Sequence, residues 1–142
     1  MIDNQVRIGV IGVGHLGQHH VKHYKTLDHV ELIGIFDIDQ ERSSEISKKF
    51  DVKIFDDLNS ILEEVDALSI VTNTEHHYKI AEKCIRNKKH VFIEKPITAV
   101  IEEADKLLLM AEQNRVLIQV GHIERLNPAL LALNKYEIKP KF

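Results

Sequence analysis

Strand-length apolar runs alternate with helical patterns along the chain. Between the apolar runs, apolar residues recur every three or four positions, as on one face of a helix. This alternation is typical of a parallel α/β sheet whose strands are joined by crossover helices. We expect strands at residues 6–11, 31–36, 52–55, 67–71, 90–93 and 116–120.

Polar residues and prolines between these runs predict where the elements begin and end. Asp39 and Thr74 are residue types that cap helix N-termini. Pro96 ends the strand before it, because proline has no N–H to donate to a sheet. Helices are expected at residues 16–27, 40–50, 57–64, 75–87, 99–114 and 127–134.

The longest predicted helix, residues 99–114, has one apolar face. The apolar positions recur at helical spacing, so we expect a stripe that packs against the sheet. The stripe comprises Val100, Ile101, Ala104, Leu107, Leu108 and Ala111.

The six strands predict one doubly wound Rossmann sheet in the order 3-2-1-4-5-6. The run at 52–55 is short and contains Lys53, which predicts a position at the sheet edge. A length of 142 residues, of which 44% are hydrophobic, is typical of one domain with a buried core. We therefore expect residues 1–136 to form a single α/β domain.

A glycine-rich turn follows the first predicted strand. Gly12, Gly14 and Gly17 have the spacing G-x-G-x-x-G between a strand and a helix. In dinucleotide-binding turns the first glycine permits the tight turn, the second admits a pyrophosphate, and the third lets helix and strand pack closely. The free N–H groups of the following helix would point at the phosphates. We assign cofactor binding to Gly12, Val13, Gly14, His15, Leu16 and Gly17.

Asp37 ends the second predicted strand, 20 residues after Gly17. A carboxylate at this position accepts hydrogen bonds from the adenosine ribose hydroxyls, and it repels the additional 2′-phosphate of NADP. Ile38 and Asp39 supply no cation, and Arg42 is expected to be solvated on a helix face. The sequence therefore favours NAD over NADP.

Polar residues also follow the fourth, fifth and sixth predicted strands. Ligands of such sheets bind beyond the carboxyl ends of the strands, so these residues are candidates for the site. They are Thr72, Asn73, Thr74, Glu94, Lys95, Gly121 and His122.

Lys95 is the candidate for chemistry. Beside a nicotinamide, a lysine can hydrogen-bond a substrate hydroxyl and stabilise the alkoxide that develops as hydride leaves. Its spacing is equally consistent with a lysine in a surface loop. His122 could bond a substrate or the cofactor amide, and Arg125 an anionic substrate group. The alternatives are a solvated histidine and a loop ion pair.

Composition narrows the range of partners. A net charge of −3 without a basic patch argues against nucleic acid, and no apolar run is long enough to span a membrane. The single Cys84 cannot form an internal disulfide, which favours a reducing cytoplasm. His15, His19, His20 and His23 lack a carboxylate or cysteine to complete a ligand set, so no metal site is expected.

These motifs together resemble those of the Gfo/Idh/MocA oxidoreductases, a family named for glucose–fructose oxidoreductase and inositol dehydrogenase. The resemblance is carried by residues 12–17, 72–81 and 94–96 and extends over essentially the whole chain. It implies that Lys95 lies in the catalytic site and that Glu94 and Lys95 border the cofactor. It also implies a cofactor loop formed by Thr72, Asn73 and His77, with Asn73 where proline is common in the family.

Residues 120–128 are similar to the branch of this family that acts on nucleotide-linked amino sugars, such as UDP-N-acetylglucosamine. The resemblance implies a second domain that supplies an acid/base residue and usually the oligomer interface. Residues 137–142 resemble the entry to that domain, and we expect the remainder to be missing from this chain. Its loss would expose apolar surface near the C-terminus and favour a homo-oligomer.

The sequence thus predicts the NAD-binding domain of a dehydrogenase that moves hydride between nicotinamide and a sugar or sugar-nucleotide hydroxyl. Lys95 and His122 are its predicted catalytic residues. One alternative is a stand-alone NAD-binding module that acts as a sensor or interaction partner without turnover. The other is a dehydrogenase of a different Rossmann family.

Overall fold

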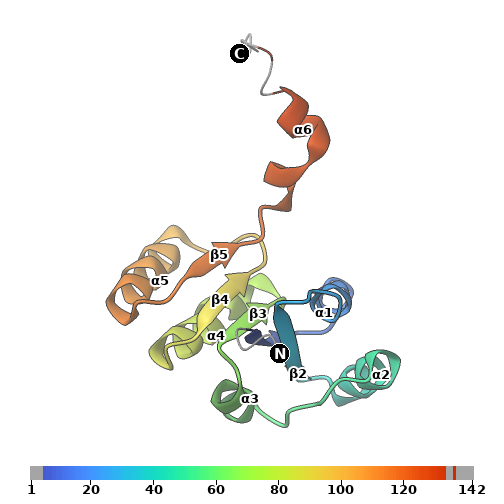
Figure 1. Ribbon diagram of the computed structural model, residues 1–142. Helices are drawn as coiled ribbons and strands as arrows, with labels where there is room; N and C mark the ends of the chain where they lie inside the picture. The colour runs from blue at the N-terminus through green and yellow to red at the C-terminus, as the bar shows by residue number, and fades with distance from the viewer. Residues whose placement is uncertain (1–4, 134–135, 137–142) are drawn as a thin grey trace.

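A parallel five-stranded sheet forms the centre of the computed structural model, which describes residues 5–133 and 136 (Figure 1). The strand order is β2-β1-β3-β4-β5, so the chain builds the sheet outward from β1 in both directions. The topological switch point, where ligands of such sheets bind, therefore lies between β1 and β3. The strands are β1 (Val6–Ile11), β2 (Val30–Phe36), β3 (Ala67–Ile70), β4 (His90–Ile93) and β5 (Ile118–Val120).

Helices cover both faces of the sheet. In Figure 1, α1 and α2 lie on one side of the strands, and α4 and α5 lie on the other. The helices are α1 (Gly17–Tyr24), α2 (Gln40–Phe50), α3 (Leu58–Glu64), α4 (Thr74–Arg86), α5 (Ile101–Asn114) and α6 (Pro128–Leu133), with a 3₁₀ turn, η1 (Ile123–Leu126).

The two faces of the sheet carry separate apolar cores. Ile11 of β1 belongs to the core beneath α4 and α5, whereas its neighbour Val10 belongs to the core beneath α1 and α2. Both side chains are buried, at 2% and 0% exposure. Burial on both faces explains why the central strands are continuous apolar runs without alternation.

The prediction of six strands was wrong, because the run at 52–55 forms a single bridge instead of a strand. Ile35 of β2 donates its N–H to Lys53 O and accepts a hydrogen bond from Phe55 N–H. The segment lies between Asp51, the left-handed cap of α2, and Asp57, the cap of α3, so too few residues remain for a ladder. The bridge lies beside β2 at the edge, where the predicted order places it.

Two aspartates cap helices with their side chains. The Asp39 carboxylate accepts from Arg42 N–H at the start of α2, as predicted, and Asp57 does the same for Asn59 and Ser60 at the start of α3. The prediction for Thr74 was wrong, because Thr74 is already the first residue of α4. Asn73 is the N-cap there, with an extended backbone and no side-chain capping bond.

Only part of the predicted apolar stripe packs against the sheet. Leu107 and Ala111 are buried, but Val100, Ile101 and Leu108 are exposed. Helix α5 begins at Ile101 rather than at residue 99, and it follows the short β4 near the end of the sheet. Only part of the apolar face of α5 is therefore buried against the sheet.

Beyond β5 the chain leaves the sheet through η1 and α6, which extend away from the rest of the structure (Figure 1). Leucines are exposed on both elements, including Leu126 and Leu130. Residue 134 and residues 137–142, where the sequence predicts the end of this helix and the entry to a second domain, lie outside the described residues. Within the described part of the chain, no helix combines the length and apolar character needed to cross a bilayer.

Candidate functional site

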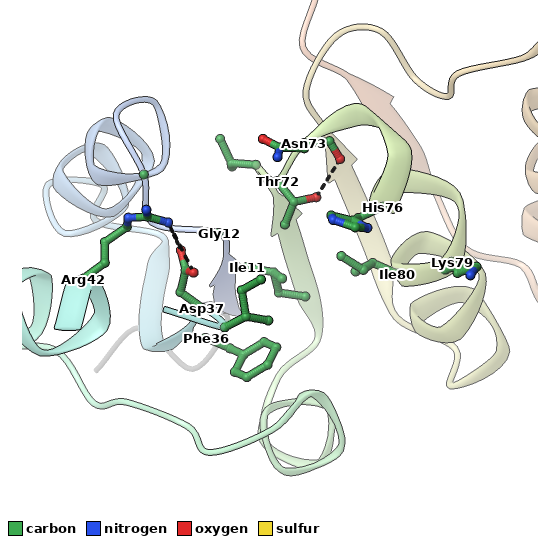
Figure 2. Close-up of a pocket in the computed structure, with 13 residues that line it drawn as sticks. Ile11, Gly12, Phe36, Asp37, Arg42, Thr72, Asn73, His76, Lys79 and Ile80 are labelled. Carbon is green, nitrogen blue, oxygen red and sulfur yellow. Dashed lines mark hydrogen bonds and ion pairs between the residues drawn. The ribbon is translucent and has the colours of Figure 1, made fainter. Parts of the chain in front are cut away.

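A cleft of about 420 Å³ lies at the carboxyl ends of β1, β2 and β3. Figure 2 shows Asp37 and Arg42 on one side of this cleft, and His76 and Ile80 of α4 on the opposite side. The cleft thus occupies the switch point of the sheet, where dinucleotides bind in doubly wound folds. Its lining residues are Ile11, Gly12, Gly14, Phe36, Asp37, Ile38, Arg42, Val71, Thr72, Asn73, His76, Lys79 and Ile80.

The three glycines of the turn differ in what surrounds them. Gly12 has φ +84°, and a Cβ added there would lie 2.7 Å from Val71 O. A Cβ at Gly17 would collide with Gly12 O, so this glycine lets α1 approach β1. At Gly14 an added Cβ would meet no atom within 4 Å. The fold itself therefore leaves the space at Gly14 empty, at the position where the motif admits a pyrophosphate.

Two backbone N–H groups hold the Asp37 carboxylate in the cleft. Its side chain is 5% exposed. One carboxylate oxygen accepts Val13 N–H at 2.8 Å, and the other accepts Asp39 N–H at 2.9 Å. Arg42 Nη1 also donates to both oxygens, at 3.5 and 3.4 Å, so a ligand hydroxyl would have to share them with this guanidinium. The backbone N–H of Val13, a predicted cofactor-binding residue, thus donates to Asp37.

The sequence led us to expect a solvated Arg42, but the structure places its guanidinium against two carboxylates. Its Nη1 lies 3.4 Å from Asp37 Oδ2, and its Nη2 lies 3.0 Å from Asp39 Oδ2. A cation thus lies beside the carboxylate predicted to bind ribose. Two carboxylates compensate its charge, which leaves the local balance negative.

His77 lies beneath the cofactor loop rather than in the cleft. Its ring is 1% exposed, with Nδ1 2.9 Å from Pro96 O and Nε2 3.0 Å from Thr72 O. It therefore ties the loop after β3 to the turn after β4. Thr72 and Asn73 line the cleft, whereas Thr74 does not.

Some predicted cofactor residues do not line the cleft. His15 and Leu16 are exposed and are not among the lining residues. The sequence analysis in turn missed His76, Lys79 and Ile80, which line the cleft from α4. Their i, i+3, i+4 spacing beyond the Thr72–Asn73 loop is the signal that could have identified them.

Glu94 and Lys95 follow β4 and face different surroundings. The Glu94 carboxylate lies 3.1 Å from His20 Nε2 and accepts Lys95 N–H at 3.2 Å, so it is turned toward α1. The Lys95 side chain is exposed, and no carboxylate among residues 5–133 and 136 forms an ion pair with it. Its ammonium is therefore available to a ligand.

A second hollow, of about 550 Å³, lies at the carboxyl end of β5. His122 and Arg125 line it together with Phe92 and Gln119. Gly121 connects this hollow to the turn after β4, because a Cβ there would lie 3.0 Å from Glu94 Oε2. Predicted site residues thus line both the cleft at β1–β3 and the hollow at the end of β5, whereas Glu94 and Lys95 line neither.

Of the four histidines near the glycine turn, His15 precedes α1, and His19, His20 and His23 lie on it. Within the part of the chain that the structure describes, no group of three or more His, Cys, Asp or Glu side chains is placed to hold an ion. His15 and His19 instead pack edge to face, with ring centroids 5.5 Å apart.

Comparison of the sequence and fold with known proteins identifies the family of this chain. A family model described as an oxidoreductase family with an NAD-binding Rossmann fold matches residues 6–122. The chain belongs to the Gfo/Idh/MocA family. The family expected from the motifs is therefore confirmed, and the chain is an NAD-binding domain of this family.

Several relatives that match this chain are named as dehydrogenases of sugars or polyols. UDP-N-acetylglucosamine 3-dehydrogenase of Acidithiobacillus ferrooxidans is 41% identical over 130 residues, which make up 92% of this chain and 41% of that protein. Its solved structure has a TM-score of 0.88 and covers 95% of this chain, while this chain covers 44% of it.

Two further relatives widen the range of substrates and cofactors. Myo-inositol 2-dehydrogenase of Thermotoga maritima is 32% identical, covering 84% of this chain and 37% of its own length. The NADP(+)-dependent scyllo-inositol 2-dehydrogenase of Bacillus subtilis is 30% identical, covering 92% and 37%. The chain thus spans well under half the length of the curated relatives that it matches.

Proposed function

We propose that this chain is the NAD-binding part of a dehydrogenase that transfers hydride between nicotinamide and the hydroxyl-bearing carbon of a sugar or sugar nucleotide. The observation that carries the proposal is the cleft at the switch point, lined by both Gly14 and Asp37. The open space at Gly14 suits a pyrophosphate, and the buried Asp37 carboxylate suits the hydroxyls of a ribose.

The chain's own groups would hold the cofactor in two halves. Asp37 would accept hydrogen bonds from the adenosine ribose hydroxyls in place of its two long contacts with Arg42 Nη1. The backbone at Gly14 and the N-terminus of α1 would face the pyrophosphate. Since the adenosine half lies at β1 and β2, the nicotinamide half would extend past β3 toward Lys95.

When bound, the nicotinamide would give or take the hydride. Lys95 would donate a hydrogen bond to the substrate hydroxyl oxygen and stabilise the negative charge that develops on it. His122, at the end of β5, is the second residue we assign to catalysis. Its place beside the second hollow supports a role in orienting the substrate.

NAD is the cofactor we propose, rather than NADP. Asp37 and Asp39 both contact the Arg42 guanidinium, so a 2′-phosphate would meet two carboxylates and only one cation. The NADP(+)-dependent relative from Bacillus subtilis makes this choice a necessary test. Titration calorimetry with both cofactors should give the lower dissociation constant for NAD.

A nucleotide-linked amino sugar is the substrate class we favour. The support is the 41% identical relative, whose name specifies UDP-N-acetylglucosamine, together with Arg125 in the second hollow as a partner for an anionic group. Saturation-transfer NMR with UDP-N-acetylglucosamine and myo-inositol would compare the two substrate classes on this chain.

One experiment separates this function from a module without turnover. The chain is titrated with NAD and then assayed for NADH formation with sugars and sugar nucleotides. Turnover by a longer product of the same gene, with NAD binding by both, supports the dehydrogenase. NAD binding without turnover in either supports the sensor or interaction module instead.

We further propose that the chain acts in the cytoplasm and self-associates. Cys84 is buried and free, and burial raises the pKa of its thiol to about 12, so it is unreactive. Exposed leucines on η1 and α6 supply an apolar surface for self-association.

A further inference from the structure

A buried polar cluster joins α1 to the turn after β4. His20 lies on α1. Its Nδ1 is 2.9 Å from Ser69 Oγ of β3, and its Nε2 is 3.1 Å from Glu94 Oε1. The side chains of His20 and Glu94 are 17% and 13% exposed. This cluster lies outside the cleft, and the cofactor contacts proposed above do not use it.

The chemistry of the partners determines the hydrogen bonds of His20. A carboxylate without a proton only accepts, so Nε2–H of the imidazole donates to Glu94, and Nδ1 accepts from the Ser69 hydroxyl. Burial lowers the pKa of His20, which favours the neutral ring that this arrangement requires. The rings of Phe92 and Tyr24 pack edge-on against the imidazole, with centroids 5.5 and 6.2 Å away, and fix its plane.

Two hydrogen bonds hold the Glu94 carboxylate, and a glycine leaves space for it. Besides His20, its carboxylate accepts the backbone N–H of Lys95 at 3.2 Å. On the far side Gly121 leaves room for it, because a Cβ at that position would lie 3.0 Å from Oε2. The position of Glu94 therefore fixes where the backbone of Lys95 begins.

We propose that His20 is a positioning residue, which holds Glu94 and through it sets the place of Lys95 at the nicotinamide half of the site. The inference rests on the proposed function, since it assumes that a nicotinamide lies beside Lys95. It connects the helix that begins at the glycine turn with the residue assigned to chemistry. His20 touches neither cofactor nor substrate in this account.

The test compares two ligands on the whole chain. ADP carries only the adenosine half with its pyrophosphate, whereas NAD also carries the nicotinamide half. His20→Phe keeps a ring but removes both polar contacts, and His20→Gln restores an N–H that can reach Glu94. Dissociation constants for both ligands and the midpoint of thermal unfolding are measured for the three proteins.

We expect His20→Phe to weaken NAD binding about tenfold, because the displaced Lys95 ammonium loses one charged hydrogen bond to the nicotinamide half, while ADP binding changes less than about twofold. His20→Gln should return the NAD affinity to within about threefold of the original. The Lys95 amide resonance should shift in His20→Phe and return toward its original position in His20→Gln.

The outcomes distinguish the two proposals. Equal weakening of NAD and ADP in His20→Phe would mean a merely structural role and would overturn the inference. An unchanged NAD affinity together with an unshifted Lys95 amide would overturn it as well. If the unaltered chain binds neither ligand, the proposed function fails first, and this inference fails with it.

Discussion

The two halves of the sheet edge differ in how completely the chain builds them. At β1 and β2, Asp37 receives backbone N–H groups from Val13 and Asp39, and the cleft beside it has walls on both sides. At β4 and β5, the Lys95 side chain is exposed, and His122 and Arg125 lie in the second hollow. In the first half, the backbone of the chain holds the carboxylate in place. In the second half, no carboxylate among the described residues forms an ion pair with Lys95.

This contrast predicts that changes in the first half alter cofactor affinity in this chain. Changes in the second half should affect that affinity less and act mainly on turnover. Gly14→Val gives the largest expected effect. The side chain would fill the space that the fold leaves open, so NAD affinity should fall at least about a hundredfold through loss of the pyrophosphate contacts.

The control for Gly14→Val is its effect on stability. Because no atom lies within 4 Å of an added Cβ, the midpoint of thermal unfolding should change little. Gly17→Val provides the opposite pattern, since its side chain would collide with Gly12 O and destabilise the fold. Calorimetric titration that finds normal NAD binding by Gly14→Val would remove the glycine turn from the site.

Asp37→Ala should have the next largest effect. Loss of hydrogen bonds to a charged acceptor should weaken NAD binding about tenfold to a hundredfold. The same change releases Arg42 from one of its carboxylate partners, so the ratio of NADP to NAD affinity should rise. Titration of the variant with each cofactor measures both effects, and Asp57→Ala, at a helix cap away from the cleft, is the matched control.

Lys95→Met tests the second half. Lys95 is exposed and does not line the cleft, but we place it at the nicotinamide half, so NAD affinity in this chain should fall about tenfold while ADP affinity changes less than about twofold. In a complete enzyme the same substitution should lower kcat about a hundredfold or more, because the alkoxide loses its donor. Equal losses in affinity and kcat would assign Lys95 to cofactor binding alone.

The smallest effect is expected from the apolar surface of η1 and α6. Leu126 is 76% exposed, and Leu130 is 46% exposed. Leu126→Glu combined with Leu130→Glu should reduce self-association without changing NAD affinity. Light scattering over a range of concentrations measures this, and a strictly monomeric unaltered chain would contradict the proposed association.

The sequence predicted the order of the five strands and the glycine turn after the first of them, because these follow from local signals. Continuous apolar runs and the G-x-G-x-x-G spacing each correspond to one physical requirement, namely burial on both faces and a close backbone approach. The run at 52–55 does not form a strand, because too few residues lie between the caps Asp51 and Asp57 for a ladder of hydrogen bonds. The apolar pattern of the run does not indicate this limit.

Contacts between distant segments could not be predicted in the same way. The Arg42 ion pairs, the two carbonyl contacts of His77 and the His20–Glu94 bond depend on how helices pack across the sheet. The i, i+3, i+4 set on α4 was visible in the sequence. Its orientation toward the cleft became clear only when β3 and α4 were in place.

A crystal structure of this chain with NAD tests the central claim most directly. The account predicts that the adenosine ribose hydroxyls lie within hydrogen-bond distance of Asp37, with the pyrophosphate over Gly14 at the start of α1. A nucleotide bound elsewhere on the molecule, or no nucleotide at saturating NAD, would contradict it.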